Sequence, residues 1–255
     1  MNTPFVALHG AFMQGSSLQT LAAALGRAAI TPGLPAHRRG LAWDPGRDYH
    51  DQALEGLIAA LPEGPVDLFG HSLGATVALR LAVEQPDRVR SLVLFEPVLF
   101  AAAHPEARDR HAAEMAPFHK ALEEGLEGSA AAHFHGLWGG GDRWEDLPDL
   151  ARRAMLRLLP IIEASAPGIF EDRPGVVPRL ADCRVPTLVL HQNQPPEIVA
   201  AISSGLRRMP LVEVRAVAGP GGHMLPLTAP QAVAAEISAF WAALPANNAR
   251  SLSTS

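Results

Sequence analysis

The chain has 255 residues, of which 48% are hydrophobic and 18% are charged, a composition typical of a globular protein with a substantial core. A formal net charge of -5 without a basic stripe argues against a nucleic-acid partner, and the single cysteine, Cys183, excludes an intrachain disulfide. No apolar run approaches the length of a membrane span and residues 1–4 lack the features of a signal peptide, so we expect a soluble, cytoplasmic protein without a membrane partner.

Short apolar runs typical of strands alternate along the chain with stretches typical of helices. In chain order, the pattern predicts strands at 5–8, 66–69, 91–95, 186–191 and 211–217, and helices at 18–27, 49–61, 75–85, 198–208 and 229–244. Several of the strands are continuously apolar, as expected when a strand is buried on both faces. The alternation predicts an α/β fold with a mostly parallel central sheet and helices on both faces.

Residues 98–181 interrupt this alternation because they contain no convincing strand. Helical stretches near 107–121 and 150–164 lie on either side of a glycine-rich bend at 139–141. The sequence therefore predicts a helical cap, 98–181, inserted into a core domain formed by 1–97 and 182–246. The polar segment 247–255 is predicted to be a flexible tail.

The most informative motif is G-x-S-x-G at residues 70–74, which read GHSLG. It follows a predicted buried strand and precedes a predicted helix. On such a sharp strand-to-helix turn, the hydroxyl of Ser72 is presented to a substrate. Glycines two residues before and after the serine are needed because a Cβ there would collide with neighbouring backbone. The motif in this context predicts that Ser72 is a nucleophile.

A serine hydroxyl is a weak nucleophile at neutral pH and needs a general base. Where such an elbow occurs, the acid and the histidine follow the serine in the chain. The glycine-rich segment 218–222 precedes His223 and lets a late loop return to the elbow. The spacing of His133 and His135 could suit a metal, but no carboxylates stand nearby at ligand spacing. We therefore predict His223 as the base and no metal site.

The chain resembles the α/β-hydrolase family over nearly its whole length. The resemblance depends on three segments in order: 9–12 (HGAF), 70–74 (GHSLG) and 221–223 (GGH). The resemblance implies the α/β-hydrolase fold and a serine-esterase-like activity. The family usually has two more strands at its start, whereas this chain opens directly on the strand before His9. Some small esterases and hydroxynitrile lyases share this short start.

The acid is where the sequence departs from the family. The resemblance implies an aspartate just after the strand that includes residues 187–190, but the loop 191–197 (HQNQPPE) contains none. Glu197 in that loop comes late and fits the start of the next helix, where a carboxylate favours the helix dipole. Glu96 ends the strand after the nucleophile helix, and haloalkane dehalogenases carry their acid after that same strand. We favour Glu96 and keep Glu197 as the alternative.

An oxyanion hole needs backbone N–H groups directed at the developing negative oxygen. Leu73 follows the nucleophile at a helix N-terminus, and Ala11 lies in the turn of the HGAF segment. We predict these two N–H groups as the donors.

The implied reaction is the hydrolysis of small to medium uncharged carboxylic esters through an acyl-enzyme, without metal or cofactor. Ser72 excludes a haloalkane dehalogenase, which needs a carboxylate nucleophile. Hydroxynitrile lyases of this layout usually have threonine in place of Gly10 and lysine in place of Met224, and cofactor-free perhydrolases have the aspartate that is missing here. Lactonase, thioesterase and C–C hydrolase activities stay open, as does a non-catalytic small-molecule receptor of the same fold.

Apolar side chains beside the motifs and in the insertion are candidates for the substrate pocket. The candidates are Phe12, Met13, Trp138 and Met224, together with Leu99, Phe100, Phe134, Trp144 and Leu225. Their character favours an uncharged or hydrophobic acyl or alkyl group, so the expected partner is a small-molecule ester.

Overall fold

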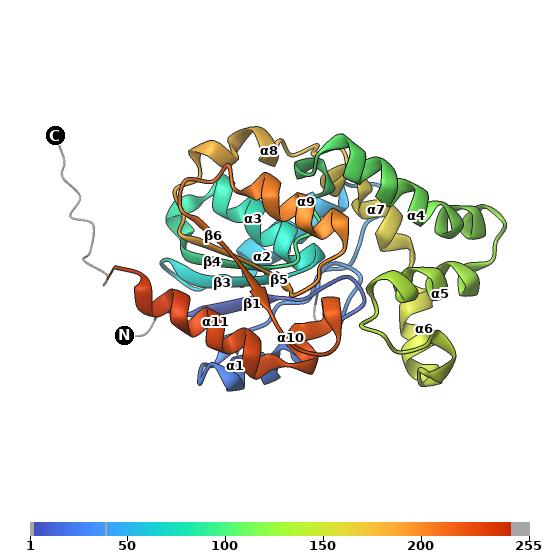
Figure 1. Ribbon diagram of the computed structural model, residues 1–255, viewed down its shortest axis with the longest axis horizontal. Helices are drawn as coiled ribbons and strands as arrows, with labels where there is room; N and C mark the ends of the chain where they lie inside the picture. Colours follow the sequence, from blue (N-terminus) through green and yellow to red (C-terminus); the bar gives the residue numbers. More distant parts are fainter. Residues whose placement is uncertain (1–2, 39, 246–255) are drawn as a thin grey trace.

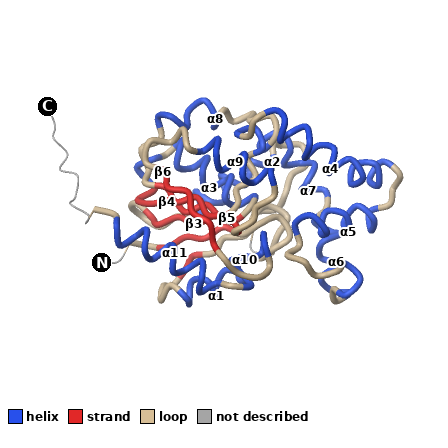
Figure 2. The backbone as a smooth tube through the Cα atoms, viewed as in Figure 1, coloured by secondary structure: helices blue, strands red, loops and turns tan. Residues whose placement is uncertain are grey.

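The computed structural model describes residues 3–38 and 40–245, and the predicted tail 247–255 lies outside them. Its six strands form one sheet, in the order β2-β1-β3-β4-β5-β6, in which every neighbouring pair is parallel. The strands are β1 (Phe5–Leu8), β2 (Ala29–Ile30), β3 (Val66–His71), β4 (Val89–Phe95), β5 (Thr187–Gln192) and β6 (Val212–Val217). The predicted α/β fold is confirmed, because helices cover both faces of this parallel sheet (Figures 1 and 2).

The core consists of two hydrophobic layers, one on each face of the sheet. One layer is formed with α2 (Tyr49–Ala60), α3 (Leu73–Glu84), α8 (Val176–Arg179) and α9 (Glu197–Leu206). The other is formed with α1 (Gln19–Ala24), α10 (Leu225–Thr228) and α11 (Pro230–Ala243). Because β3 is buried along its whole length, its apolar residues contribute to both layers, Leu68 to one and Phe69 to the other.

The element boundaries differ from the predicted ones mostly by a few residues. β3 continues to His71 and α3 begins at Leu73, so a single residue, Ser72, connects strand and helix. β2 was not predicted, since two residues at the edge of the sheet are too few to form a recognisable pattern. The predicted helix 18–27 ends earlier, at Ala24, before Gly26 adopts a positive φ of 64°.

Within residues 98–181 the described structure is helical. Its longer helices are α4 (Pro105–Glu123), α5 (Glu127–Trp138), α6 (Asp149–Leu158) and α7 (Pro160–Ile169). The predicted stretch 150–164 is two helices, because Pro160 lacks an N–H group and starts α7 instead of continuing α6. α5 was not predicted as a helix. α4 to α7 form a group beyond the carboxyl ends of the strands, whereas α8 packs against α3 (Figure 1).

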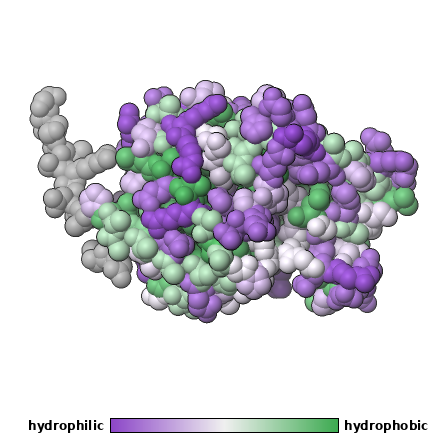
Figure 3. All heavy atoms as spheres, viewed as in Figure 1, coloured by the Kyte–Doolittle hydropathy of each residue, from purple (hydrophilic) through white to green (hydrophobic). Residues whose placement is uncertain are grey.

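Hydrophilic side chains cover much of the visible surface, and hydrophobic ones form small separate patches (Figure 3). Among the residues that the structure describes, no helix is both long enough and apolar enough to cross a membrane.

Candidate active site

Ser72 lies at the point where β3 turns into α3. Its backbone has φ 55° and ψ -121°, and its N–H donates to the carbonyl of Phe95 at 3.0 Å. A positive φ in a residue other than glycine costs on the order of 1–3 kcal/mol, and such conformations persist where the surrounding structure enforces them. The strain places the serine at the N-terminus of α3, facing a cavity.

The two glycines of the motif are required by close packing. A Cβ on Gly70 would lie 2.7 Å from the backbone nitrogen of Ala75, and one on Gly74 would lie 2.8 Å from the carbonyl carbon of Leu8. Since real Cβ atoms essentially never come this close to backbone, any larger residue would force the turn to move.

Glu96 lies at the end of β4, and His223 lies in the loop that follows β6. His223 Nδ1 is 2.6 Å from Glu96 Oε2, and both side chains are buried. The N–H of Gln192, the last residue of β5, donates to Glu96 Oε1 at 2.8 Å. With Glu96 as acceptor, Nδ1 of His223 carries the proton, and Nε2 keeps the lone pair that a general base needs.

Glu197, the alternative acid, is the first residue of α9 and its side chain is 52% exposed. It pairs with Arg110 of α4. The structure therefore brings Glu96, and not Glu197, into contact with His223.

His71, directly before Ser72, holds the loop of His223. Its Nε2 lies 2.8 Å from the backbone carbonyl of His223, and the two rings are 4.7 Å apart. Burial, followed by the nearby His223, keeps the pKa of His71 well below 6.5. The ring is therefore neutral, with the proton on Nε2 donated to that carbonyl. In the sequence, His71 is a variable position of the G-x-S-x-G motif, and its place beside Ser72 is the one signal of this role.

The backbone N–H groups of Ala11 and Leu73 donate to no acceptor within the described residues, and both residues line the cavity beside Ser72. His37 Nε2 bonds the carbonyl of Ala11, which belongs to the next peptide unit and holds the following part of the turn. The two N–H groups are thus available to a substrate oxygen.

The turn that contains Ala11 is held by a second histidine. His9 Nδ1 donates to the carbonyl of Gly10 at 2.8 Å, and its Nε2 accepts from the N–H of Leu34 at 3.1 Å. Burial, followed by the proximity of His37, lowers the pKa of His9 to about 3, so that its ring stays neutral and able to accept.

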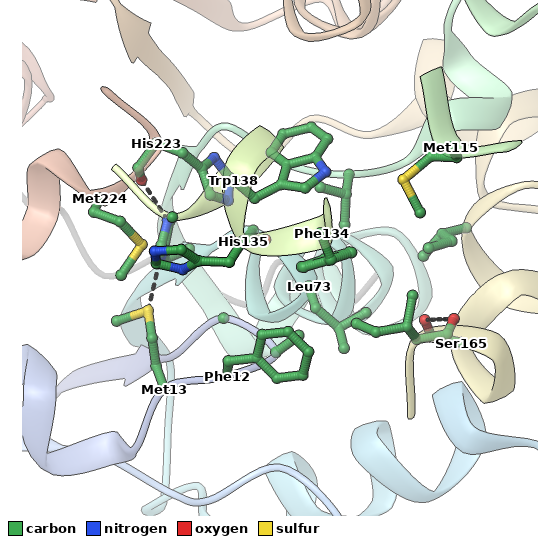
Figure 4. Close-up of a pocket in the computed structure, with 18 of the residues that line it drawn as sticks. Phe12, Met13, Leu73, Met115, Phe134, His135, Trp138, Ser165, His223 and Met224 are labelled. Carbon is green, nitrogen blue, oxygen red and sulfur yellow. Dashed lines mark hydrogen bonds between the residues drawn. The ribbon is translucent and has the colours of Figure 1, made fainter. Parts of the chain in front are cut away.

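A cavity of about 100 Å³ lies between the carboxyl ends of the strands and the helices α4 to α7 (Figure 4). Of the predicted pocket residues, six line it: Phe12, Met13, Phe100, Phe134, Trp138 and Met224. Leu99 and Leu225 are instead buried in the two core layers, and Trp144 packs among the helices of the insertion. The indole of Trp138 meets the His223 ring edge-on, with centroids 4.8 Å apart.

The sequence offered no signal for several lining residues of the insertion. These are His111, Met115, Met155, Ile162, Ser165, Ile169 and Phe170. No Asp, Glu, Lys or Arg is among the lining residues that the structure describes. The cavity thus offers an apolar surface with a few neutral polar groups.

The sequence profile of the alpha/beta hydrolase family matches residues 5–236. The chain belongs to this family. The match covers the segments on which the predicted resemblance depends, and the resemblance is confirmed.

Two relatives of this alpha/beta hydrolase come from Mycobacterium tuberculosis. Lipase LipV is 42% identical over 52 residues, which cover 20% of this chain and 20% of the lipase. Esterase Rv0045c is 33% identical over 109 residues, which cover 41% of this chain and 34% of the esterase. The matched segments thus span about a fifth and a third of these relatives.

Among solved structures, MenH from S. aureus shares the fold of this hydrolase. The two are 20% identical with a TM-score of 0.71, over 95% of this chain and 94% of MenH. At this identity the likeness supports the fold alone.

The two histidines with metal-like spacing bond to backbone. His133 Nε2 lies 2.7 Å from the carbonyl of Glu114, and His135 Nε2 lies 2.9 Å from that of Asp142. In the described part of this hydrolase, no group of three or more His, Cys, Asp or Glu side chains is arranged to hold a metal ion.

Proposed function

We propose that the protein is a serine hydrolase that cleaves carboxylic esters, with Ser72 as nucleophile, His223 as base and Glu96 as the acid. The observation that carries the proposal is the 2.6 Å contact between His223 and Glu96. It lies at the carboxyl ends of the central strands, where the strained Ser72 also lies. The family, and the esterase and lipase among the distant relatives, support ester hydrolysis.

In the proposed cycle, Ser72 Oγ attacks the ester carbonyl while His223 Nε2 takes its proton. Glu96 stabilises the imidazolium that forms, without taking the proton itself. The N–H groups of Ala11 and Leu73 donate to the oxyanion, and the loss of one such donor costs about 3–4 kcal/mol in hydrolases. His223 then protonates the leaving alcohol. It afterwards activates a water molecule that releases the acid.

The substrate is proposed to be uncharged and of small to medium size. Moving an ionised group into an apolar site is costly unless a partner charge compensates it. The described lining of the cavity offers no such charge. Lactones, thioesters and activated C–C bonds meet the same requirement, and the same residues would act on them.

A receptor without catalytic activity is the competing proposal from another class. Such a receptor would bind its ligand in the same cavity and would not need Ser72 as a nucleophile. We therefore expect wild-type protein to turn over p-nitrophenyl esters steadily, and Ser72→Ala to lose at least about 10³-fold in kcat.

Ser203→Ala is the matched control. Ser203 is a buried serine on α9 outside the cavity, and its hydroxyl has no partner within the described residues. Its loss should leave the rate unchanged. Equal rates in wild type and Ser72→Ala, or no turnover of any ester, thioester or lactone, would reject the proposed activity.

A further inference from the structure

The wall of the cavity formed by the insertion contains three buried polar side chains, His111 of α4, His135 of α5 and Ser165 of α7. His135 Nε2 bonds the carbonyl of Asp142. Figure 4 shows Ser165 and Met115 at the end of the cavity opposite His223. His111 lies one helical turn before Met115 on α4. Apolar lining thus separates His111 and Ser165 from the proposed nucleophilic centre, and Trp138 packs against both His111 and His223.

His111 presents an unused acceptor to the cavity. Its ring stacks on Phe100 with centroids 4.6 Å apart, and its Nδ1 lies 3.4 Å from Glu114 Oε2. Nε2 makes no hydrogen bond to the described residues and keeps some accessible surface, and the residue lines the cavity. With the proton on Nδ1 directed at the carboxylate, Nε2 keeps its lone pair. Burial lowers the pKa of His111, which favours this neutral ring.

The hydroxyl hydrogen of Ser165 is also already used in a hydrogen bond. Its hydroxyl donates to the carbonyl of Ile162 at 2.9 Å. The hydroxyl oxygen keeps accepting capacity. His111 and Ser165 therefore both offer acceptors rather than donors.

A purely hydrocarbon substrate would displace water from these acceptors and leave them unpaired. An unsatisfied buried polar group is unfavourable, whereas a substrate hydroxyl would restore the hydrogen bond. We propose that His111 and Ser165 recognise a hydroxyl group on the part of the ester remote from the scissile bond. This inference rests on the proposed ester hydrolysis and names its substrate class: uncharged hydroxylated esters.

The test compares matched ester pairs by pH-stat. One pair is an ethyl alkanoate and its ω-hydroxy analogue, and the other is an alkyl acetate and its ω-hydroxy analogue, each in a series of rising chain length. Two pairs are needed because either the acyl or the alcohol part could occupy this end. At one chain length, wild type should favour the hydroxylated member in kcat/KM by about tenfold or more.

His111→Phe keeps an aromatic ring in the stack but removes the acceptor, and should abolish this preference. Ser165→Ala should reduce it. Met115→Leu is the control, because it changes the shape of the same wall without changing its polarity, and it should alter both rates of a pair together. A wild type without preference at any chain length, or a His111→Phe variant that retains it, would overturn the inference.

Binding separates this inference from the proposed reaction. The Ser72→Ala variant is titrated with the same pairs by calorimetry, where tighter binding of the hydroxylated member is expected. Adding His111→Phe should remove the difference. A protein that binds with this selectivity but hydrolyses nothing would refute the reaction and retain the recognition site. If the protein hydrolyses esters but binds both members of each pair equally tightly, only the recognition site is refuted.

Discussion

Glu96 is buried at the end of β4, with its two carboxylate oxygens bonded to the N–H of Gln192 and to His223. Its backbone has a positive φ of 42°, so the position is strained as well as buried. Burying a carboxylate is costly unless such partners satisfy its oxygens. The contacts suit an acid that orients His223.

At this scale we predict that Glu96→Gln lowers kcat/KM for a p-nitrophenyl ester by about 10³–10⁴-fold. A glutamine side chain has a single oxygen, so it cannot accept from both Gln192 and His223. Its NH2 group would face one of these two donors, and facing Nδ1 it favours the wrong tautomer of His223, with the proton on Nε2. Glu197→Gln is the matched control, since its exposed ion pair with Arg110 contributes little. The assignment of the acid would be wrong if the two variants exchanged these effects.

At the scale of elements, the connection from β3 to α3 depends on the absence of side chains at two positions. Gly70→Ala would press a Cβ against the backbone of Ala75, and an overpacked site of this kind costs about 1–3 kcal/mol. We expect a corresponding loss in the free energy of unfolding, measured in urea, together with loss of the proposed esterase activity.

Gly136→Ala is the control for this substitution. Gly136 is an exposed interior position of α5, and no heavy atom outside its own helix lies within 4 Å of the added Cβ. Alanine there should increase stability by up to about 1 kcal/mol. Equal effects at the two glycines would contradict the packing argument.

The strands of the centre were predictable because local pattern and burial agree. β3, β4 and β5 are mostly apolar in the sequence, and most of their residues are buried in the sheet. α5 was missed because two glycines, Gly128 and Gly136, weaken the helical signal of its sequence. The packing of α5 against α4 and α6 compensates for this weak intrinsic propensity.

At the scale of the whole molecule, buried neutral histidines couple stability to pH. Burial, followed by the like charge of Arg80, lowers the pKa of His50 to about 3, and that of His9 is lowered to about 3 as well. In the unfolded chain both return to about 6.5. As pH falls below 6.5, the unfolded state takes up protons that the folded state does not, so stability decreases.

We therefore expect the free energy of unfolding to fall between about pH 6.5 and about pH 4.5, by on the order of 2 kcal/mol for each of these histidines. Urea unfolding followed by tryptophan fluorescence measures the slope. His50→Gln removes one of the groups and should make the slope shallower. A slope unaffected by this substitution would show that His50 does not contribute to it.

The sequence by itself determined the class of fold, the family, and Ser72 and His223 as predicted catalytic residues. These depend on local spacing and chain order: a glycine-flanked serine between strand and helix, and a histidine after late glycines. The sequence favoured Glu96 over Glu197 as the acid, but only the tertiary structure shows the contact of Glu96 with His223, because the two residues are separated by 127 positions. His111 and Ser165 also meet only in the tertiary structure, where the packing of α4 and α7 beside the carboxyl ends of the strands brings them to one cavity. Local pattern predicts which segments form strands and helices, whereas contacts between distant segments decide which side chains meet.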